Sequence, residues 1–242
     1  MTRTLIHGFL LVLVSCPASA DGLIFKSPRE GDWVLYTISD KITESDGTEV
    51  SVSGTLKMTA LSTVTVNGET SRWIELVVRA KQNDDSFSHV DKLLVPESDL
   101  AAGKDPLQHL QKMWRQNPET TGEVRDFKDF SGPRARLLSS LRPLLHGPSK
   151  DAIQLESIPI DSTKGGMLNC DGITYASKSD ESGTSITSNY TVRLHDQVPF
   201  GVVSYSADRS ISRDDNALSV VTMRLILAGY GSDGVTVLPN RE

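Results

Sequence analysis

Hydrophobic and polar residues alternate with a period of two over much of the chain, which is the pattern of β-strands with one buried face. The first such run, residues 31–42 (GDWVLYTISDKI), is rich in aromatic and β-branched residues and predicts a strand. The next, residues 50–61 (VSVSGTLKMTAL), places its large apolar residues on one face and serine, threonine and lysine on the other. A strand with one polar face is typical of an antiparallel sheet.

The clearest local signal is the pair Asn67–Gly68 between two strand-like runs. Type I′ hairpin turns select this pair because both residues must adopt positive φ. The strand that follows directs Ile74, Leu76, Val78 and Ala80 to one face, while the opposite face carries two apolar exceptions: Trp73 and Val77. With a further run at 87–95, the first part of the chain is expected to form a meander of about five strands.

The second half of the chain returns to strand patterns. Residues 186–194 alternate apolar and polar side chains, and residues 217–231 have the length and content of a long strand. The short run 235–238, followed by Pro239, predicts a final edge strand. The other expected strands of this half lie at 152–160, 166–177 and 198–210.

Between these two sets of strands the pattern changes to a helical one. Asp105 is suited to a helix N-cap and Pro106 to the first helical position. Helical spacing then continues in two groups of residues, and Pro143 is expected to end or kink the second helix. The groups are Leu107, Leu110 and Met113 or Trp114, and then Leu137, Leu138, Leu141, Leu144 and Leu145.

Strands that are segregated from helices indicate an α+β fold. We therefore expect a curved antiparallel β-sheet, a meander or half-barrel, with a helical insertion near residues 97–147. Residues 21–242 are expected to form a single domain, because neither set of strands has helices of its own to cover it.

The N-terminal residues 1–20 have the charge, length and cleavage chemistry of a secretory signal peptide. Two processing sites are open. Leu13–Cys16 fits a lipoprotein box, which would make Cys16 a lipid-bearing N-terminus, whereas Ala18–Ala20 fits signal peptidase and would discard Cys16. We favour cleavage after Ala20, because Pro17 directly follows the cysteine and only about ten residues precede the first strand. The expected location is periplasmic or extracellular, with an outer-envelope lipoprotein as the alternative.

Charge and cysteine content narrow the functional classes. The chain has a net charge of −6, and loss of residues 1–20 would remove Arg3 and no acid, so a nucleic-acid partner is not expected. No stretch after the leader has the roughly 20 apolar residues of a membrane span. Cys170 would be the remaining cysteine, so the fold cannot rest on internal disulfides, and a small buried apolar role is expected for it.

Motifs for catalysis, metals and cofactors were sought and none carries a prediction. His89, His109, His146 and His195 are too far apart for a metal motif and are expected at the surface or at caps. GYGSDG at 229–234 matches a dinucleotide fingerprint in spacing but precedes VTVLP instead of a helix. We predict no catalytic, cofactor or metal residue.

Two weaker features have ordinary explanations. The sequon at Asn189 lies inside a predicted strand. A basic stripe in the second helical segment could contact anionic lipid head groups, although a solvated helix face explains it more simply. The stripe consists of Arg134, Arg136, Arg142, His146 and Lys150.

The segment Val198–Pro199–Phe200–Gly201, within this order of elements, resembles the bacterial half-barrel proteins related to the lipoprotein-carrier family. The resemblance implies a curved sheet and helices that enclose an apolar cavity for lipid chains. No functional residue of that family can be matched to a position here. Pro199 and Gly201 also have a simpler role in shaping a turn.

Three functional hypotheses remain. The first is an exported bacterial envelope or secreted protein that binds an apolar ligand or a lipidated partner between sheet and helices. The second is a non-catalytic structural or interaction module of the envelope, with another envelope protein as partner. The third is a hydrolase whose catalytic residues are dispersed along the chain. The absence of clustered catalytic residues favours a protein that is not an enzyme.

Overall fold

The computed structural model describes residues 23–83, 85–100, 104–116, 124–127, 152–162, 166–181, 184–213 and 216–238. These residues form one antiparallel sheet of eleven strands. The strands are β1 (Trp33–Glu44), β2 (Glu49–Val66), β3 (Glu69–Gln82), β4 (Asp85–Pro96), β5 (Lys112–Gln116), β6 (Val124–Phe127), β7 (Ile153–Ser162), β8 (Gly166–Glu181), β9 (Thr184–Leu194), β10 (Val202–Arg213) and β11 (Asn216–Gly231).

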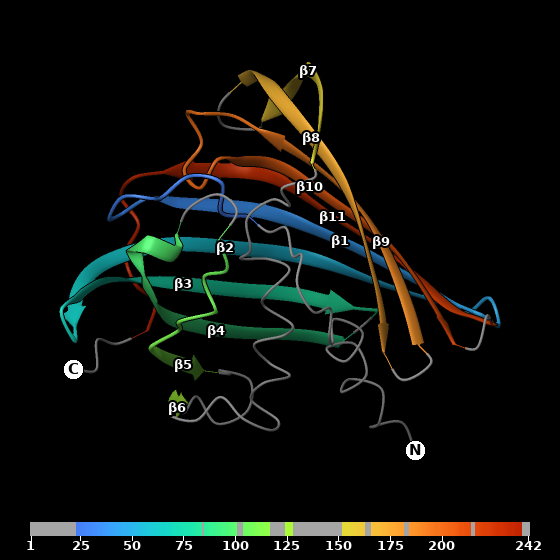
Figure 1. Cartoon of the computed structure of the whole chain (residues 1–242), viewed down its shortest axis with the longest axis horizontal. Helices are drawn as coiled ribbons and strands as arrows, with labels where there is room; N and C mark the ends of the chain where they lie inside the picture. The colour runs from blue at the N-terminus through green and yellow to red at the C-terminus, as the bar shows by residue number, and fades with distance from the viewer. Residues whose placement is uncertain are drawn as a thin grey trace.

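The sheet is built from two meanders that meet at its centre. Its order is β6-β5-β4-β3-β2-β1-β11-β10-β9-β8-β7, so β1 pairs with β11 and the edges are β6 and β7. Figure 1 shows the sheet bending strongly from β4 to β8. At the β7 end the bend is tight enough for β7 to contact β11, although three strands separate them in the sheet.

The expected α+β fold with a helical insertion is wrong. Among the described residues the only helical element is a single 3₁₀ turn, η1 (Glu97–Asp99). The part of the expected insertion that the structure describes contains β5 and β6. The second predicted helix, residues 133–147, lies outside the described residues, and so does the leader with Cys16.

The residues from Asp105 onward form a turn and a strand because both faces of the segment are buried. Asp105 accepts a hydrogen bond from the Leu107 N–H at 2.9 Å and closes one turn. Met113 then packs into the larger buried cluster, while Trp114 packs against Trp73 on the opposite side of the sheet, with ring centroids 4.6 Å apart. Adjacent residues that point to opposite faces require a strand.

Every strand predicted in the two halves is present apart from the last one, although the first half has four strands before η1 and not about five. Asn67 and Gly68 have φ values of 52° and 83°, which confirms the predicted hairpin turn. The alternation of β3 is also confirmed, because Ile74 and Leu76 lie in one buried cluster and Trp73 and Val77 in the other.

The two faces of the sheet therefore carry two separate cores. The inner face, inside the bend, holds the larger cluster, with residues from β1 to β5 and from β8 to β11. The outer face of β2–β5 holds a smaller one: Leu61, Trp73, Val77, Val90, Leu94, Trp114 and Leu238. The inner cluster includes Val34, Tyr36, Leu56, Met58, Leu76, Leu93, Cys170, Tyr190, Tyr205 and Leu225.

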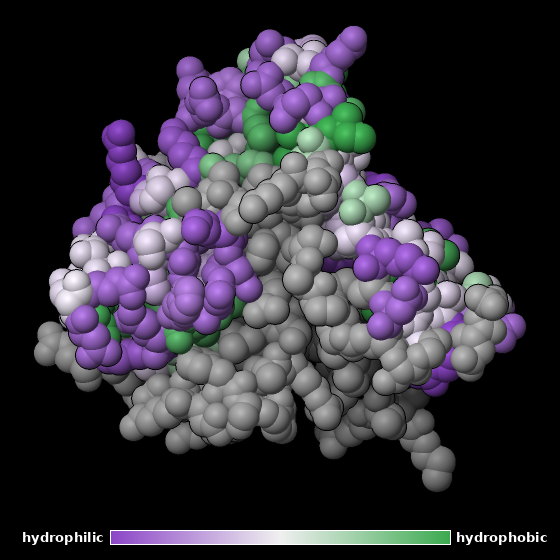
Figure 2. All heavy atoms as spheres, in the orientation of Figure 1, coloured by the Kyte–Doolittle hydropathy of each residue, from purple (hydrophilic) through white to green (hydrophobic). Residues whose placement is uncertain are grey.

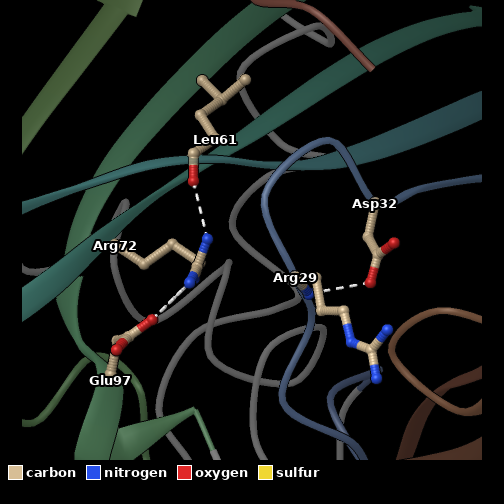
Figure 3. A network of polar contacts seen from close by, with 5 residues as sticks. All are labelled: Arg29, Asp32, Leu61, Arg72 and Glu97. Carbon is tan, nitrogen blue, oxygen red and sulfur yellow. Dashed lines mark hydrogen bonds and ion pairs between the residues drawn. The ribbon is translucent and has the colours of Figure 1, made fainter. Parts of the chain in front are cut away.

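A polar network holds the chain where it leaves β4 (Figure 3). The Arg72 guanidinium donates to the Glu97 carboxylate through Nε and Nη2 and to the Leu61 carbonyl through Nη1 at 2.9 Å. Close by, the Asp32 carboxylate accepts the Arg29 N–H at 2.7 Å at the start of β1. These contacts fix one rim of the sheet, since they tie β3 to η1 and to the β2 backbone.

The predicted final edge strand is wrong. Residues 232–238, which we call the C-terminal strap, lie on the outer face and belong to no strand. The strap begins beside Gly31, whose carbonyl accepts the Gly234 N–H at 2.8 Å. Gly31 has φ of +84°, and a Cβ there would lie 2.6 Å from the Ser232 carbonyl oxygen, so the close crossing requires glycine.

Candidate functional site

The inner face is apolar across most of the sheet, but two groups of polar side chains interrupt it, and the first is spread over β1, β10, β9 and β8. Arg209 of β10 pairs in register with Ser188 of β9, which pairs with Ser177 of β8. In the adjacent row, Asp40 of β1 is followed across the sheet by Met223, Ala207, Tyr190 and Tyr175. We call Asp40, Ser177, Ser188 and Arg209 the inner polar cluster.

Three members of the inner polar cluster carry a buried oxygen without a hydrogen bond. Asp40 is 6% exposed, Arg209 7% and Ser188 0%. Within the part of the chain that the structure describes, Asp40 Oδ1, Ser177 Oγ and Ser188 Oγ have no hydrogen-bond partner. Buried polar groups are normally paired, so each such atom requires an explanation, and a ligand is one of them.

Burial and Arg209 act in opposite directions on Asp40. Desolvation raises the pKa of the Asp40 carboxyl to about 7, although the nearby Arg209 charge lowers it. The guanidinium carbon of Arg209 also lies 6.0 Å from the centre of the Tyr190 ring, within range of a cation–π contact. The cluster thus contains a carboxyl whose pKa lies near neutral pH and a guanidinium whose permanent charge lowers that pKa.

Three tyrosines form an aromatic wall beside this cluster. The Tyr175 and Tyr190 rings stack with centroids 4.7 Å apart, and Tyr190 and Tyr205 are tilted at 6.2 Å. All three rings are at least 95% buried. Their register places them on β8, β9 and β10, where the sheet bends most tightly.

A second polar group on the inner face centres on an ion pair between Arg115 and Asp91. The Arg115 guanidinium forms a two-pronged ion pair with Asp91, with Nε–Oδ1 at 2.8 Å and a terminal nitrogen to Oδ2 at 3.0 Å. His89 Nε2 lies 3.5 Å from the same carboxylate. Burial raises the pKa of Asp91 to about 6 and, together with Arg115, lowers that of His89 to about 3. At neutral pH this group is an ion pair beside a neutral imidazole.

The outer face carries a contrasting polar row that the strap covers. Glu75, wholly buried, accepts the Val237 N–H at 2.8 Å and the Leu238 N–H at 3.1 Å, and the Thr236 hydroxyl lies 2.7 Å from it. Its cross-strand neighbour Lys92 places its ammonium 5.3 and 5.4 Å from the centres of the Trp73 and Trp114 rings. Every oxygen of Glu75 therefore has a donor from the chain itself.

The residues singled out from the sequence are scattered. Cys170 is buried in the inner cluster, where burial raises its thiol pKa, in keeping with a small apolar role. His89 is partly buried instead of exposed, while His109 contacts Asp99 at 2.9 Å. His146 and the basic stripe lie outside the described residues, and Asn189 lies within β9.

The glycine-rich and VPFG motifs have structural roles. GYGSDG spans the end of β11 and the start of the strap, so it holds no dinucleotide-type helix. In the VPFG segment the Gly201 N–H donates to the Val198 carbonyl at 3.0 Å, and the Phe200 side chain is fully buried. The segment is a core-anchored turn between β9 and β10.

Metal and membrane features can be stated for the described residues alone. No group of three histidine, cysteine or acidic side chains among them is arranged to hold a metal ion. None of the helices in the same ranges has the length and hydrophobicity to cross a bilayer.

No sequence motif includes Asp40 or Arg209, but the alternation of apolar and polar residues in each strand points to both. Both strands alternate, and the positions that face inward read Val34, Tyr36, Ile38, Asp40, Ile42 in β1 and Val203, Tyr205, Ala207, Arg209, Ile211 in β10. A lone charge on an otherwise apolar strand face predicts a buried polar group with a specific purpose.

Comparison with known proteins adds likenesses of shape only. No protein-family model and no curated protein matches the chain. A Bacteroides fragilis structure described as an exported protein with a YmcC-like fold covers 86% of this chain and 99% of its own, with 8% identity and a TM-score of 0.32. A Parabacteroides distasonis structure described as a lipoprotein covers 88% and 100%, with 10% identity and a TM-score of 0.32.

A β-barrel-like protein of a domain family of unknown function from Brucella abortus covers 86% of this chain and 98% of its own, with 8% identity and a TM-score of 0.27. TM-scores below 0.5 carry no argument about function. The half-barrel resemblance noted in the sequence therefore rests on the open, bent antiparallel sheet of this chain and on its VPFG turn.

Proposed function

We propose that the chain is an exported envelope or secreted protein that binds an apolar ligand against the inner face of its sheet. The single observation that carries the proposal is the set of unpartnered polar atoms of Asp40, Ser177 and Ser188 within an apolar face. Leaving such atoms unpaired costs about 1–3 kcal/mol each. A ligand that supplies their partners on binding explains why the chain keeps them.

Two further features support binding on this side of the sheet. The inner face is the inside of a bend, so a ligand there would contact several strands at once (Figure 1). The Tyr175–Tyr190–Tyr205 wall provides flat apolar surface beside the polar cluster. Binding sites of small molecules commonly combine apolar walls with a few convergent polar groups.

The proposal is tested with the exported protein purified without detergent. Native mass spectrometry should show a bound species that solvent extraction removes, and the extracted protein should take up the apolar fluorophore N-phenyl-1-naphthylamine. Ala207→Phe should reduce uptake at least 10-fold, because Ala207 lies between Met223 and Tyr190 on the inner face. Ser206→Phe, on the opposite face of β10, is the matched control.

The outcomes decide the proposal even if one variant is unstable. Equal uptake by Ala207→Phe, Ser206→Phe and the parent, with no bound species in the mass spectrum, would refute it. If Ala207→Phe fails to fold, Ala207→Leu tests the same position with a smaller side chain. Intact mass of the exported chain separately tests cleavage after Ala20 against lipidation of Cys16.

A second candidate function, an interaction module, is favoured by one specific observation. Figure 2 shows apolar surface gathered over β7 and β8. Exposed apolar residues of these strands are Ile153, Ile158 and Met167, and β7 is an edge of the sheet. An exposed edge can pair with a strand of a partner, although Pro159 removes one donor. Ile153→Lys should abolish such pairing and leave uptake of the fluorophore unchanged.

A further inference from the structure

Two side chains of the inner polar cluster are immediate neighbours across a pair of strands. Ser177 of β8 lies directly opposite Ser188 of β9 in the antiparallel register. Both lie on the inner face, because each is two residues from a tyrosine of the inner core, Tyr175 or Tyr190. Residues that are directly opposite have Cβ atoms about 4.5–5.5 Å apart. We call Ser177 and Ser188 the serine pair.

The hydroxyl oxygens of the serine pair are buried, and neither has a hydrogen-bond partner within the ranges that the structure describes. They therefore do not bond to each other, and Ser188 is wholly buried. Each hydroxyl carries one proton and can rotate about its C–O bond. At the separation of directly opposite residues, both hydroxyls can point at a single acceptor atom between them.

The two donors select the chemistry of that acceptor. A carbonyl oxygen has two lone pairs, so it accepts both serine protons and brings no donor of its own. A ligand hydroxyl brings a proton that needs a further acceptor, and an ammonium group has no lone pair for either serine. A polar atom left without a partner in apolar surroundings is unfavourable, so a carbonyl oxygen is the best match.

The neighbours of the serine pair fit an apolar chain attached to the carbonyl group. Tyr175 and Tyr190, next along the two strands, stack with ring centroids 4.7 Å apart and are both at least 95% buried. Their rings offer apolar surface on one side of the pair. Arg209 of β10 lies opposite Ser188 in the register, so a carboxylate oxygen is a second source of the same acceptor chemistry.

We propose that the serine pair holds the carbonyl oxygen of an acyl group, and that the ligand of the inner face is a long-chain acyl compound. This inference rests on the proposed binding function. Both hydroxyls donate to the carbonyl oxygen, and the acyl chain lies against the stacked tyrosines. The pair determines which polar group is accepted, while the apolar residues of the inner face contribute affinity for the chain.

The test is displacement of N-phenyl-1-naphthylamine from the solvent-extracted protein by two ligands that differ only in the carbonyl group. Methyl laurate should displace the fluorophore at a concentration about 10-fold lower than dodecyl methyl ether, because a site that is built to hydrogen-bond one group discriminates against analogues that lack it. Laurate distinguishes the two sources of the acyl oxygen. Tighter binding of laurate than of methyl laurate assigns the site to free acids, and the reverse order assigns it to esters.

Variants identify the residues responsible. Ser188→Ala should weaken methyl laurate several-fold and leave dodecyl methyl ether unchanged, because the ether has no carbonyl oxygen to lose a donor. Ser177→Ala with Ser188→Ala should give the two ligands equal affinity. Thr187→Ala is the matched control, since it removes an exposed hydroxyl from the opposite face of the same strand.

The experiment separates failure of this inference from failure of the proposed function. If the fluorophore does not bind at all, the proposed function fails and the inference with it. If it binds but the ether displaces it as well as methyl laurate, or the double variant keeps the preference, the serine pair serves an internal water or the fold, and the acyl assignment is overturned. The two ligands are compared on the parent protein, so the result holds even if a substitution prevents folding.

Discussion

A buried acidic side chain has different hydrogen-bond partners on the two faces of the sheet. On the outer face, Glu75 is surrounded by donors of the C-terminal strap and lies beside Lys92. On the inner face, Asp40 is 6% exposed with one oxygen unpartnered, and Arg209 is the charge that compensates it. Glu75 therefore finds its hydrogen-bond donors within the chain, whereas one oxygen of Asp40 has no partner among the described residues.

The difference lies in what satisfies each acid: the strap serves Glu75, whereas the proposed function assigns a ligand to Asp40. Burial of the outer row depends on residues far along the chain, since the strap reaches Glu75 from more than 160 positions away. Such a contact contributes to stability and closes the outer face. Under the proposed function, the inner cluster is expected to lower stability when no ligand is bound, since binding sites commonly cost stability.

The largest expected effect follows from replacing the outer charged pair by apolar residues. Glu75→Leu with Lys92→Met removes the acceptor of the Val237 and Leu238 N–H groups and of the Thr236 hydroxyl. Each orphaned donor costs about 1–3 kcal/mol, so the free energy of unfolding should fall by about 3–5 kcal/mol. Urea denaturation measures the change.

A truncated chain shows whether the strap is the cause. If the chain ends after Gly231, the same double substitution should cost much less, because the donors that Glu75 serves are then absent. Interacting groups give non-additive effects of this kind, and equal costs in the two backgrounds would contradict the role assigned to the strap.

The equivalent exchange on the inner face should act with the opposite sign. Asp40→Leu with Arg209→Met replaces charges that lie in an apolar face and leaves no strap donors behind. Replacing buried ionic groups by apolar ones is often stabilising by about 1–4 kcal/mol, and we expect a gain within this range for the ligand-free protein. Urea denaturation of the extracted protein measures the gain. A loss of stability as large as that of the outer pair would remove the distinction between the faces.

The third effect is a pH dependence that Asp40 dominates. Its pKa is raised from 3.8 to about 7 and that of Asp91 to about 6, so the folded protein keeps protons that the unfolded chain releases. Their contribution to stability is fully present below pH 3.8 and is lost as the pH rises through 6 and 7. His89, lowered from 6.5 to about 3, contributes in the opposite sense and loses stability as the pH falls below 6.5.

Asp40→Asn isolates the carboxyl of the inner cluster from these opposing groups. The fall in unfolding free energy between pH 4 and 7 should become shallower by at most about 1.4 kcal/mol per pH unit. The difference in slope between the variant and the parent isolates Asp40, because Asp91 and His89 contribute equally to both proteins. Thermal or urea unfolding across this range measures the slope, with Asp208→Asn as control. An unchanged slope would mean that Asp40 is not held protonated by burial.

The sheet and part of the candidate site could be predicted from the sequence because period-two alternation reports which side chains share a face. The same alternation isolates Asp40 and Arg209 as lone charges among apolar neighbours. The sequence predicts a helix around Met113 and Trp114, because a pair of adjacent apolar residues fits a helical and a strand pattern equally well. Only the structure shows that both faces of the sheet are buried at this point. The strap was assigned to a strand since VTVL has strand composition, and only the distant Glu75 determines its backbone partners.

The smallest effect is expected for the acid on the outer face that no strap covers. Asp208 contacts Arg224 at 3.0 and 3.2 Å and the Thr222 hydroxyl at 3.0 Å, but nearly half of its side chain is exposed. Exposed ion pairs contribute about 0–1 kcal/mol, so Asp208→Ala should reduce the unfolding free energy by less than about 1 kcal/mol, and added salt should shrink the difference. Asp208 and Glu75 face the same side of one sheet. A similar loss of unfolding free energy at both positions would show that location on the outer face determines the loss. The expected difference instead attributes the larger loss at Glu75 to the hydrogen-bond donors of the strap.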